Sequence, residues 1–217
     1  MLNKTRPKIF VIVMVMTLLL IAYGGRTERL TQTLSSESER LLCELQGRLN
    51  FIMGYTDTDA YNAILKITDS YWMKMTPSAS DKNQLTVHEE NKINGSCVGL
   101  SFNMTIDGDH VDLSLPNIST VFQVLPGCDG CVVFRANCTA RDLSKLFHMM
   151  NINIDITDEE LTTHAIYLMA RETSVKDSDL EQFKQQASCL GFTGEPNFSY
   201  DPKHDFCAEG EGTHLSL

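Results

Sequence analysis

The chain has 217 residues, of which 28 are acidic and 18 basic, and its formal net charge is −10. This length suits one domain with a substantial hydrophobic core. The acidic balance disfavours nucleic acids and anionic membranes as partners.

The first 24 residues have the organisation of a secretory signal peptide. A basic lead with Lys4, Arg6 and Lys8 precedes an apolar run over Ile9–Ala22. The run is short for a membrane span, which needs about 20 residues, and the order of regions is that of a cleaved leader. We predict cleavage after Gly24, which removes three basic residues and shifts the charge from −10 to −13. An uncleaved membrane anchor is the alternative.

Most of the remaining chain alternates between apolar and polar residues with the period of two that indicates β-strands. An Asp-Gly turn at residues 107–108 predicts a hairpin. The predicted strands are Leu49–Tyr55, Tyr71–Met75, Leu85–Val87, Cys97–Thr105, Val111–Leu115, Ser119–Leu125, Val132–Ala136 and Ala165–Ala170.

Three segments depart from this pattern and have helical spacing. They are Asp59–Lys66, Arg141–Met150 and a tail helix that begins near Ser174–Ser178 and closes at Cys189. An apolar stripe on the tail helix indicates that it packs against the strands. From Ala208 the sequence is rich in Gly and Glu, so we predict a disordered tail over 208–217 and a single domain over 25–207.

Five N-x-S/T sequons lie downstream of the leader, which predicts a secreted, extracellular glycoprotein. The predicted glycosylation sites are Asn94, Asn103, Asn117, Asn137 and Asn197.

A glycan also fixes which face of a strand points outward. If Asn103 and Asn137 face solvent, the apolar residues that alternate with them point inward. Eight antiparallel strands remove their edges by closing into a barrel, which has room for one small ligand. The predicted ligand-pocket residues, which include no carboxylate, are Tyr71, Met73, Val98, Leu100, Phe102, Met104, Val111, Leu113, Phe122, Val124, Val132 and Phe134.

Three motifs carry a family resemblance: LPGCDGC before an apolar strand, YLMARE, and DLEQFKQQASCLGF running on to DPKHDFC. The chain resembles the lipocalins, within them the alpha-1-acid glycoprotein and apolipoprotein M branch, and most closely fish proteins of the saxitoxin- and tetrodotoxin-binding type. The resemblance implies an all-β fold, an eight-stranded antiparallel up-and-down barrel with a C-terminal α-helix packed outside. It covers the mature chain and is strongest from Asn91 onward.

The chain departs from the family at the start of the first strand. Lipocalins have a G-x-W triplet there, and Gly47-Arg48-Leu49 takes its place. The family's arginine near the last strand, which covers that tryptophan, matches Arg171. We expect its stem to pack on Leu49 instead.

The branch pattern implies two long-range disulfides, Cys43–Cys189 and Cys97–Cys207. Cys128 and Cys131 lie at a Gly-containing turn between apolar segments, which favours a local disulfide. A redox C-x-x-C motif and half of a zinc site are the alternatives. Cys138 is then the odd thiol.

The sequence contains no G-x-S-x-G, H-E-x-x-H, P-loop or dinucleotide motif, so we expect neither an enzyme nor a cofactor or metal site. The leading hypothesis is a carrier of small lipophilic or amphipathic molecules in a barrel calyx. One alternative is sequestration of guanidinium toxins such as saxitoxin or tetrodotoxin. Another is a secreted protein-interaction or immunomodulatory glycoprotein with a filled barrel, using the surface of Arg141–Met150.

Overall fold

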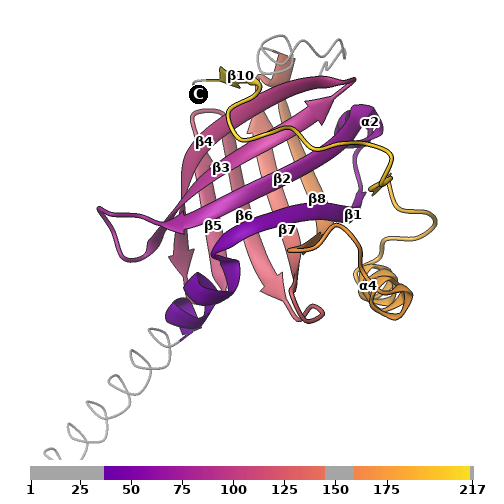
Figure 1. Cartoon of the computed structure of the whole chain (residues 1–217), viewed down its shortest axis with the longest axis horizontal. Coiled ribbons are helices and arrows are strands. Elements are labelled where there is room, and N and C mark those ends of the chain that lie inside the picture. The colour runs from indigo at the N-terminus through magenta and orange to yellow at the C-terminus, as the bar shows by residue number, and fades with distance from the viewer. Residues whose placement is uncertain (1–36, 145–158, 216–217) are drawn as a thin grey trace, which may run out of the picture.

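Eight antiparallel strands form a closed barrel in the computed structural model, which describes residues 37–144 and 159–215 (Figure 1). Each strand pairs with the next along the chain, and β8 pairs with β1 to close the ring. The predicted up-and-down barrel is therefore confirmed. The strands are β1 (Gly47–Thr56), β2 (Thr68–Pro77), β3 (Gln84–Ile93), β4 (Ser96–Asp107), β5 (His110–Leu115), β6 (Ile118–Leu125), β7 (Cys131–Arg141) and β8 (Glu160–Ala170).

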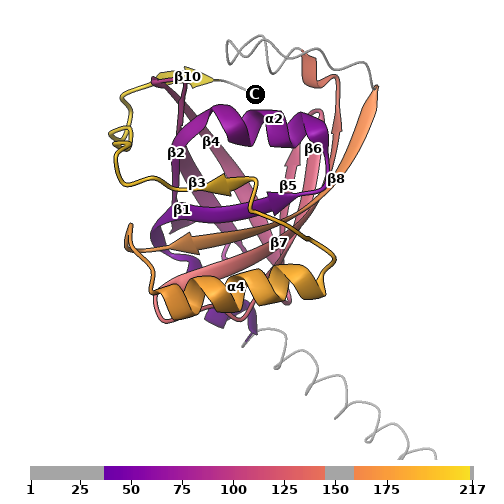
Figure 2. The ribbon, with the colours of Figure 1, turned by 90° about the vertical axis from the view of Figure 1, so that its right-hand side faces the viewer.

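Two helices flank the barrel in the positions that the sequence predicts. Figure 2 shows α2 (Asp59–Ile67) lying across one end of the barrel and α4 (Asp177–Cys189) lying along its outside. Within the described ranges, no helix is long and apolar enough to cross a membrane. The predicted signal peptide lies outside the described residues.

The predicted helix Arg141–Met150 differs from the structure at its first residues. β7 continues through Arg141, and Asp142 then takes a left-handed backbone with φ 49°. Helical geometry begins at residue 143, and residues 145–158 lie outside the described part of the chain.

A bulge in β1 divides its side chains between two hydrophobic clusters. The pairing with β8 shifts register between Phe51 and Met53. Before the bulge, Phe51 points into the barrel; after it, Met53 and Tyr55 pack on the outside, where Tyr55 lies against Phe183 of α4. This second cluster holds the tail helix on the barrel, as its apolar stripe predicts.

The end of the barrel opposite α2 is closed by helical residues 37–45, whose Leu41 and Leu45 are buried with Leu49. Leu49 is 0% exposed and belongs to the same hydrophobic cluster as these two leucines. The guanidinium of Arg171 donates hydrogen bonds to the carbonyl oxygens of Glu44 (3.0 Å) and Gln46 (2.8 Å). Arg171 thus caps the carbonyl end of this helical turn.

The C-terminal segment is ordered against the barrel, in contrast to the disorder predicted from Ala208. Strand β9 (Phe198–Ser199) pairs with β1, and β10 (Thr213–Leu215) pairs with β4 in parallel. The disulfide Cys97–Cys207 ties the segment to β4, and the Trp72 indole donates to the carbonyl oxygen of Cys207 over 2.8 Å. The segment from Cys207 to Leu215 is thus attached to the barrel at both of its ends. A prediction of disorder from composition does not take such attachments into account.

The remaining cysteines correct one prediction. Cys128 and Cys131 form the local disulfide, but Cys43 and Cys189 are both free, so the expected Cys43–Cys189 bond is absent from the structure. Phe192, three residues after Cys189, packs near Tyr55. Eight residues of β1, about 26 Å, separate Tyr55 from the barrel end that holds Cys43, and a disulfide requires Cα atoms within about 7 Å.

Candidate functional site: a cavity inside the barrel

The barrel encloses a cavity of about 300 Å³ between α2 and the closed end. The structure places nine of the twelve predicted pocket residues around it: Tyr71, Met73, Leu100, Phe102, Met104, Val111, Leu113, Phe122 and Phe134. These side chains come from β2 and from β4 to β7. The prediction that apolar residues alternating with the sequon asparagines point inward is therefore confirmed for those of β4 and β7.

Three predicted pocket residues do not line the cavity. Val124 and Val132 flank the β6–β7 connection, where side chains fill the closed end of the barrel. Val98 is buried near the start of β4 but does not reach the cavity.

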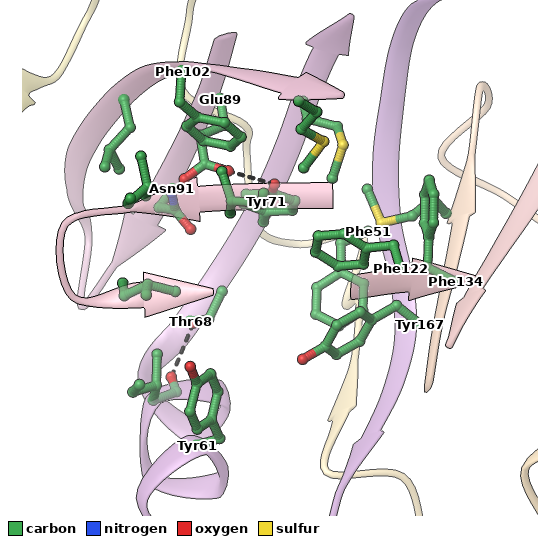
Figure 3. Close-up of a pocket in the computed structure, with 18 of the residues that line it drawn as sticks. Phe51, Tyr61, Thr68, Tyr71, Glu89, Asn91, Phe102, Phe122, Phe134 and Tyr167 are labelled. Carbon is green, nitrogen blue, oxygen red and sulfur yellow. Dashed lines mark hydrogen bonds between the residues drawn. The ribbon is translucent and has the colours of Figure 1, made fainter. Parts of the chain in front are cut away.

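A carboxylate points into this apolar space, contrary to the expectation that the pocket contains none. Glu89 of β3 lines the cavity, and the Tyr71 hydroxyl donates to its Oε2 over 2.6 Å (Figure 3). The Asn91 side-chain amide lies 3.5 Å from the other carboxylate oxygen. Glu89, Tyr71 and Asn91 therefore form one polar spot in an otherwise hydrophobic wall; we call it the polar triad.

Burial dominates the electrostatics of the polar triad. Desolvation raises the pKa of Glu89 above its usual value, although the hydrogen bonds from Tyr71 and Asn91 partly oppose this. Desolvation, followed by the nearby Glu89 charge, raises the pKa of Tyr71 well above its usual value. Tyr71 therefore stays protonated and donates, while the environment penalises a charge on Glu89 unless a positive partner arrives.

Aromatic rings form the wall beside the polar triad, where Phe51 of β1 meets the Tyr71 ring edge-on at a centroid distance of 6.1 Å. Phe51 stacks on Phe198 at a centroid distance of 4.3 Å and meets Tyr167 edge-on at 5.4 Å. Gly54 makes this possible, because a Cβ there would lie 2.5 Å from the Phe51 ring. The C-terminal segment thus contributes Phe198 to the barrel interior.

Helix α2 covers the mouth of the cavity. Its Tyr61, Ile64 and Leu65 line the space from above. The Tyr61 hydroxyl lies 3.0 Å from the Cys138 sulfur of β7, so the helix contacts the far wall. Burial raises the pKa of Tyr61 far above its usual value, with the Cys138 thiol as a second cause, so the hydroxyl stays neutral.

Sequence reasoning missed the cavity-lining residues of β1, β3, β8 and α2. The predicted third strand ended at Val87, but its alternation continues through Glu89 and Asn91, which would have placed both inward. Tyr167 of β8 lies on the inward face by the same rule. For the α2 residues, no pattern in the chain indicates that an amphipathic helix lies over a barrel mouth.

The predicted glycosylation sites lie on the outer surface to different degrees. Asn94, Asn103, Asn117 and Asn137 are exposed. Asn197 is half-buried, and its side-chain oxygen accepts a hydrogen bond of 2.9 Å from the Thr56 amide.

Searches with the sequence match no protein-family model and no curated protein, whereas the structure matches solved lipocalins. The siderocalin Q83 aligns over 78% of this chain and 96% of its own, with 15% identity and a TM-score of 0.55. The siderocalin Ex-FABP aligns over 73% of this chain and 95% of its own, with 14% identity and a TM-score of 0.51. At these identities the likeness concerns the backbone, and the chain therefore has the lipocalin fold.

Proposed function

We propose that this protein binds and carries small lipophilic or amphipathic molecules in the barrel cavity. The observation that supports this most is the cavity itself, about 300 Å³ and lined mainly by apolar side chains. Such a space is at the small end of the range for ligand pockets. Removing ligand surface from water contributes about 25 cal/mol per Å² of apolar area. Met73, Met75 and Met104 add flexible walls that tolerate varied ligand shapes.

The polar triad favours amphipathic ligands that carry a basic group. A buried carboxylate without a positive partner is unfavourable, and an amine or guanidinium inserted beside Glu89 would supply that partner. Asn91 and the Tyr71 hydroxyl offer further hydrogen bonds. The same arrangement supports the second candidate, sequestration of a guanidinium toxin, which needs an inward acid.

We also propose that the protein is a secreted, extracellular glycoprotein. The leader of residues 1–24 and the exposed sequons support this. The disulfide Cys97–Cys207 is of the kind that forms in oxidising compartments. The solved structures with this fold include Ex-FABP, described as functioning through dual ligand specificities, and Q83, described by a dual ligand binding mode.

The protein-interaction alternative receives less support. It requires a barrel filled by its own side chains, and the cavity argues against that. The surface it would use, Arg141–Met150, lies mostly outside the described residues.

Ligand binding can be tested by filling the cavity. Leu100→Trp places an indole in the cavity, where it takes up space that the ligand would fill. We expect the affinity for a fluorescent fatty-amine probe to fall at least about tenfold. The apolar contact area that the ligand loses to the indole is worth more than about 1.4 kcal/mol, which corresponds to that factor. Val121→Trp, at an exposed position of β6, is the matched control and should bind normally.

Equal affinities of the two variants would contradict binding in the barrel. Titration with dodecylamine, dodecanol and dodecanoate then resolves the polar preference, since we expect the amine to bind most tightly. Direct titration with tetrodotoxin decides the toxin candidate. Native mass spectrometry of the secreted protein tests whether it carries a ligand, since we expect a small molecule to co-purify with it.

A further inference from the structure

A second group of polar side chains lies on the outer face of the barrel, away from the cavity. His88 and Glu90 of β3 and His214 of β10 place their ligand atoms within 4.8 Å of one another. Two imidazoles and one carboxylate are a donor set that binds divalent transition metals.

The sheet register brings these residues together. Glu90 pairs with Gly99 of β4, and Gly99 pairs in turn with His214. Glu90, Gly99 and His214 therefore form one row across β3, β4 and β10. Gly99 leaves the space that the row needs. A Cβ built there would lie 3.0 to 3.1 Å from the Glu90 carboxylate atoms.

Glu90 is the least satisfied group of this cluster. It is 1% exposed, and its Oε1 accepts a hydrogen bond of 2.7 Å from the Gly210 amide. Its Oε2 has no hydrogen-bond partner within the described ranges. A buried carboxylate with a free oxygen needs a positive partner or a further donor.

His88 is positioned to complete such a site. Its Nδ1 lies 2.9 Å from the Ser101 hydroxyl, which fixes the ring. Its Nε2 lies 3.3 Å from Glu90 Oε1, within ion-pair distance, but it is buried and makes no hydrogen bond among the described residues. A ligating imidazole in proteins is commonly held in this way, with its other nitrogen bonded to a second group.

We propose that His88, Glu90 and His214 bind one divalent transition-metal ion, of which zinc is the representative. Tetrahedral zinc needs ligand atoms about 3.4 Å apart, given metal–ligand bonds of about 2.1 Å. The ligand atoms lie within 4.8 Å of one another, so the exposed His214 ring would have to turn toward the other two ligands on binding. Three protein ligands leave the fourth position to water. The ion would join β10 to β3 across β4 and so clamp the C-terminal segment to the barrel.

The test uses the full secreted chain in which Cys43 and Cys189, both exposed thiols, are replaced by serine so that they bind no metal. Isothermal titration with zinc chloride should show one ion per chain. His214→Ala should weaken zinc binding at least about tenfold, since even residues behind the ligands contribute 10- to 100-fold. His214 is exposed, so the variant should fold normally.

His110→Ala is the matched control, because His110 is a partly exposed histidine of another strand. It should bind zinc like the parent. A structural readout accompanies the titration: zinc should slow proteolysis of residues 208–217 in the parent and in His110→Ala, but not in His214→Ala. Glu90→Gln should also weaken binding without changing the barrel's circular dichroism. The proposal is overturned if the parent binds no stoichiometric zinc, or if His214→Ala and His110→Ala bind it equally.

Discussion

At the scale of single residues, Glu89 is the one acid among the described residues that line the cavity. Glu89 sits beside Tyr71 and Asn91 in a space that otherwise disfavours charge. Its folded-state pKa is raised, chiefly by desolvation. The folded protein therefore holds a proton on Glu89 at pH values where the unfolded chain has lost it.

This difference predicts a pH dependence of stability. The unfolding free energy falls as pH rises from the unfolded pKa of Glu89, about 4.3, toward its higher folded pKa, because over this window the folded state binds more protons. Glu89→Gln removes this contribution, so the variant should gain stability relative to wild type as pH rises through the same window. Urea unfolding from pH 4 to pH 8, with a chelator present, measures the difference. A difference that is constant with pH would contradict a raised pKa.

Glu89 also shows how much of the cavity lining the sequence could predict. The alternation of Leu100, Phe102 and Met104 was enough to place these side chains inside, because a sequon fixed the outer face. The predicted third strand ended at Val87, before the polar run HEENK at residues 88–92. In the structure β3 continues through this run, since Glu89 has hydrogen-bond partners inside and Glu90 is covered outside by the C-terminal segment. Such coverage comes from residues over 100 positions away, which local patterns do not register.

At the scale of elements, β1 changes its register and its pairing partner midway along its length. Phe51 still follows the inward alternation of Leu49, but the bulge turns Met53 and Tyr55 outward. After Asn50 the strand pairs with β9 in place of β2. The period of two predicted the strand but not the bulge. The helices α2 and α4 were predictable from their apolar spacing, whereas β9 and β10 are too short to have a pattern of their own.

The bulge makes Gly54 a sensitive position. In Gly54→Ala the new methyl group meets the Phe51 ring, and overpacking of this kind typically costs about 1–3 kcal/mol of unfolding free energy. Phe51→Leu removes the ring edge, so Gly54→Ala should cost clearly less in a Phe51→Leu background. A double-mutant cycle by urea unfolding gives the coupling. Additive effects would show that the ring is not what restricts this site.

At the scale of the whole molecule, closure of the barrel and the wrapping of its C-terminal segment depend on different parts of the sequence. Strand closure follows from eight alternating segments and was predictable, as was the disulfide Cys97–Cys207 through the family resemblance. The free Cys43 and Cys189 show the limit of that resemblance. A cysteine pattern gives a pairing only if both elements keep their positions, and the tail helix carries Cys189 away from the closed end.

Removing the long-range disulfide should loosen the whole fold. The paired Cys97→Ser and Cys207→Ser changes release a loop of 110 residues, which by the chain-entropy relation lowers the unfolding free energy by about 4–5 kcal/mol. Paired changes at Cys128 and Cys131, which close a loop of three residues, should cost much less. Chemical denaturation of both double variants measures this order. Equal losses would indicate that loop length does not set the effect.

The strand β7 has one further consequence. Asn137, a sequon residue, faces solvent, while its neighbour Cys138 is buried under Tyr61 at the mouth. Adjacent residues thus face opposite surfaces of the same wall. Because Tyr61 of α2 lies over the Cys138 sulfur, we expect the rate at which an alkylating reagent labels this thiol to report how often α2 moves away from the mouth.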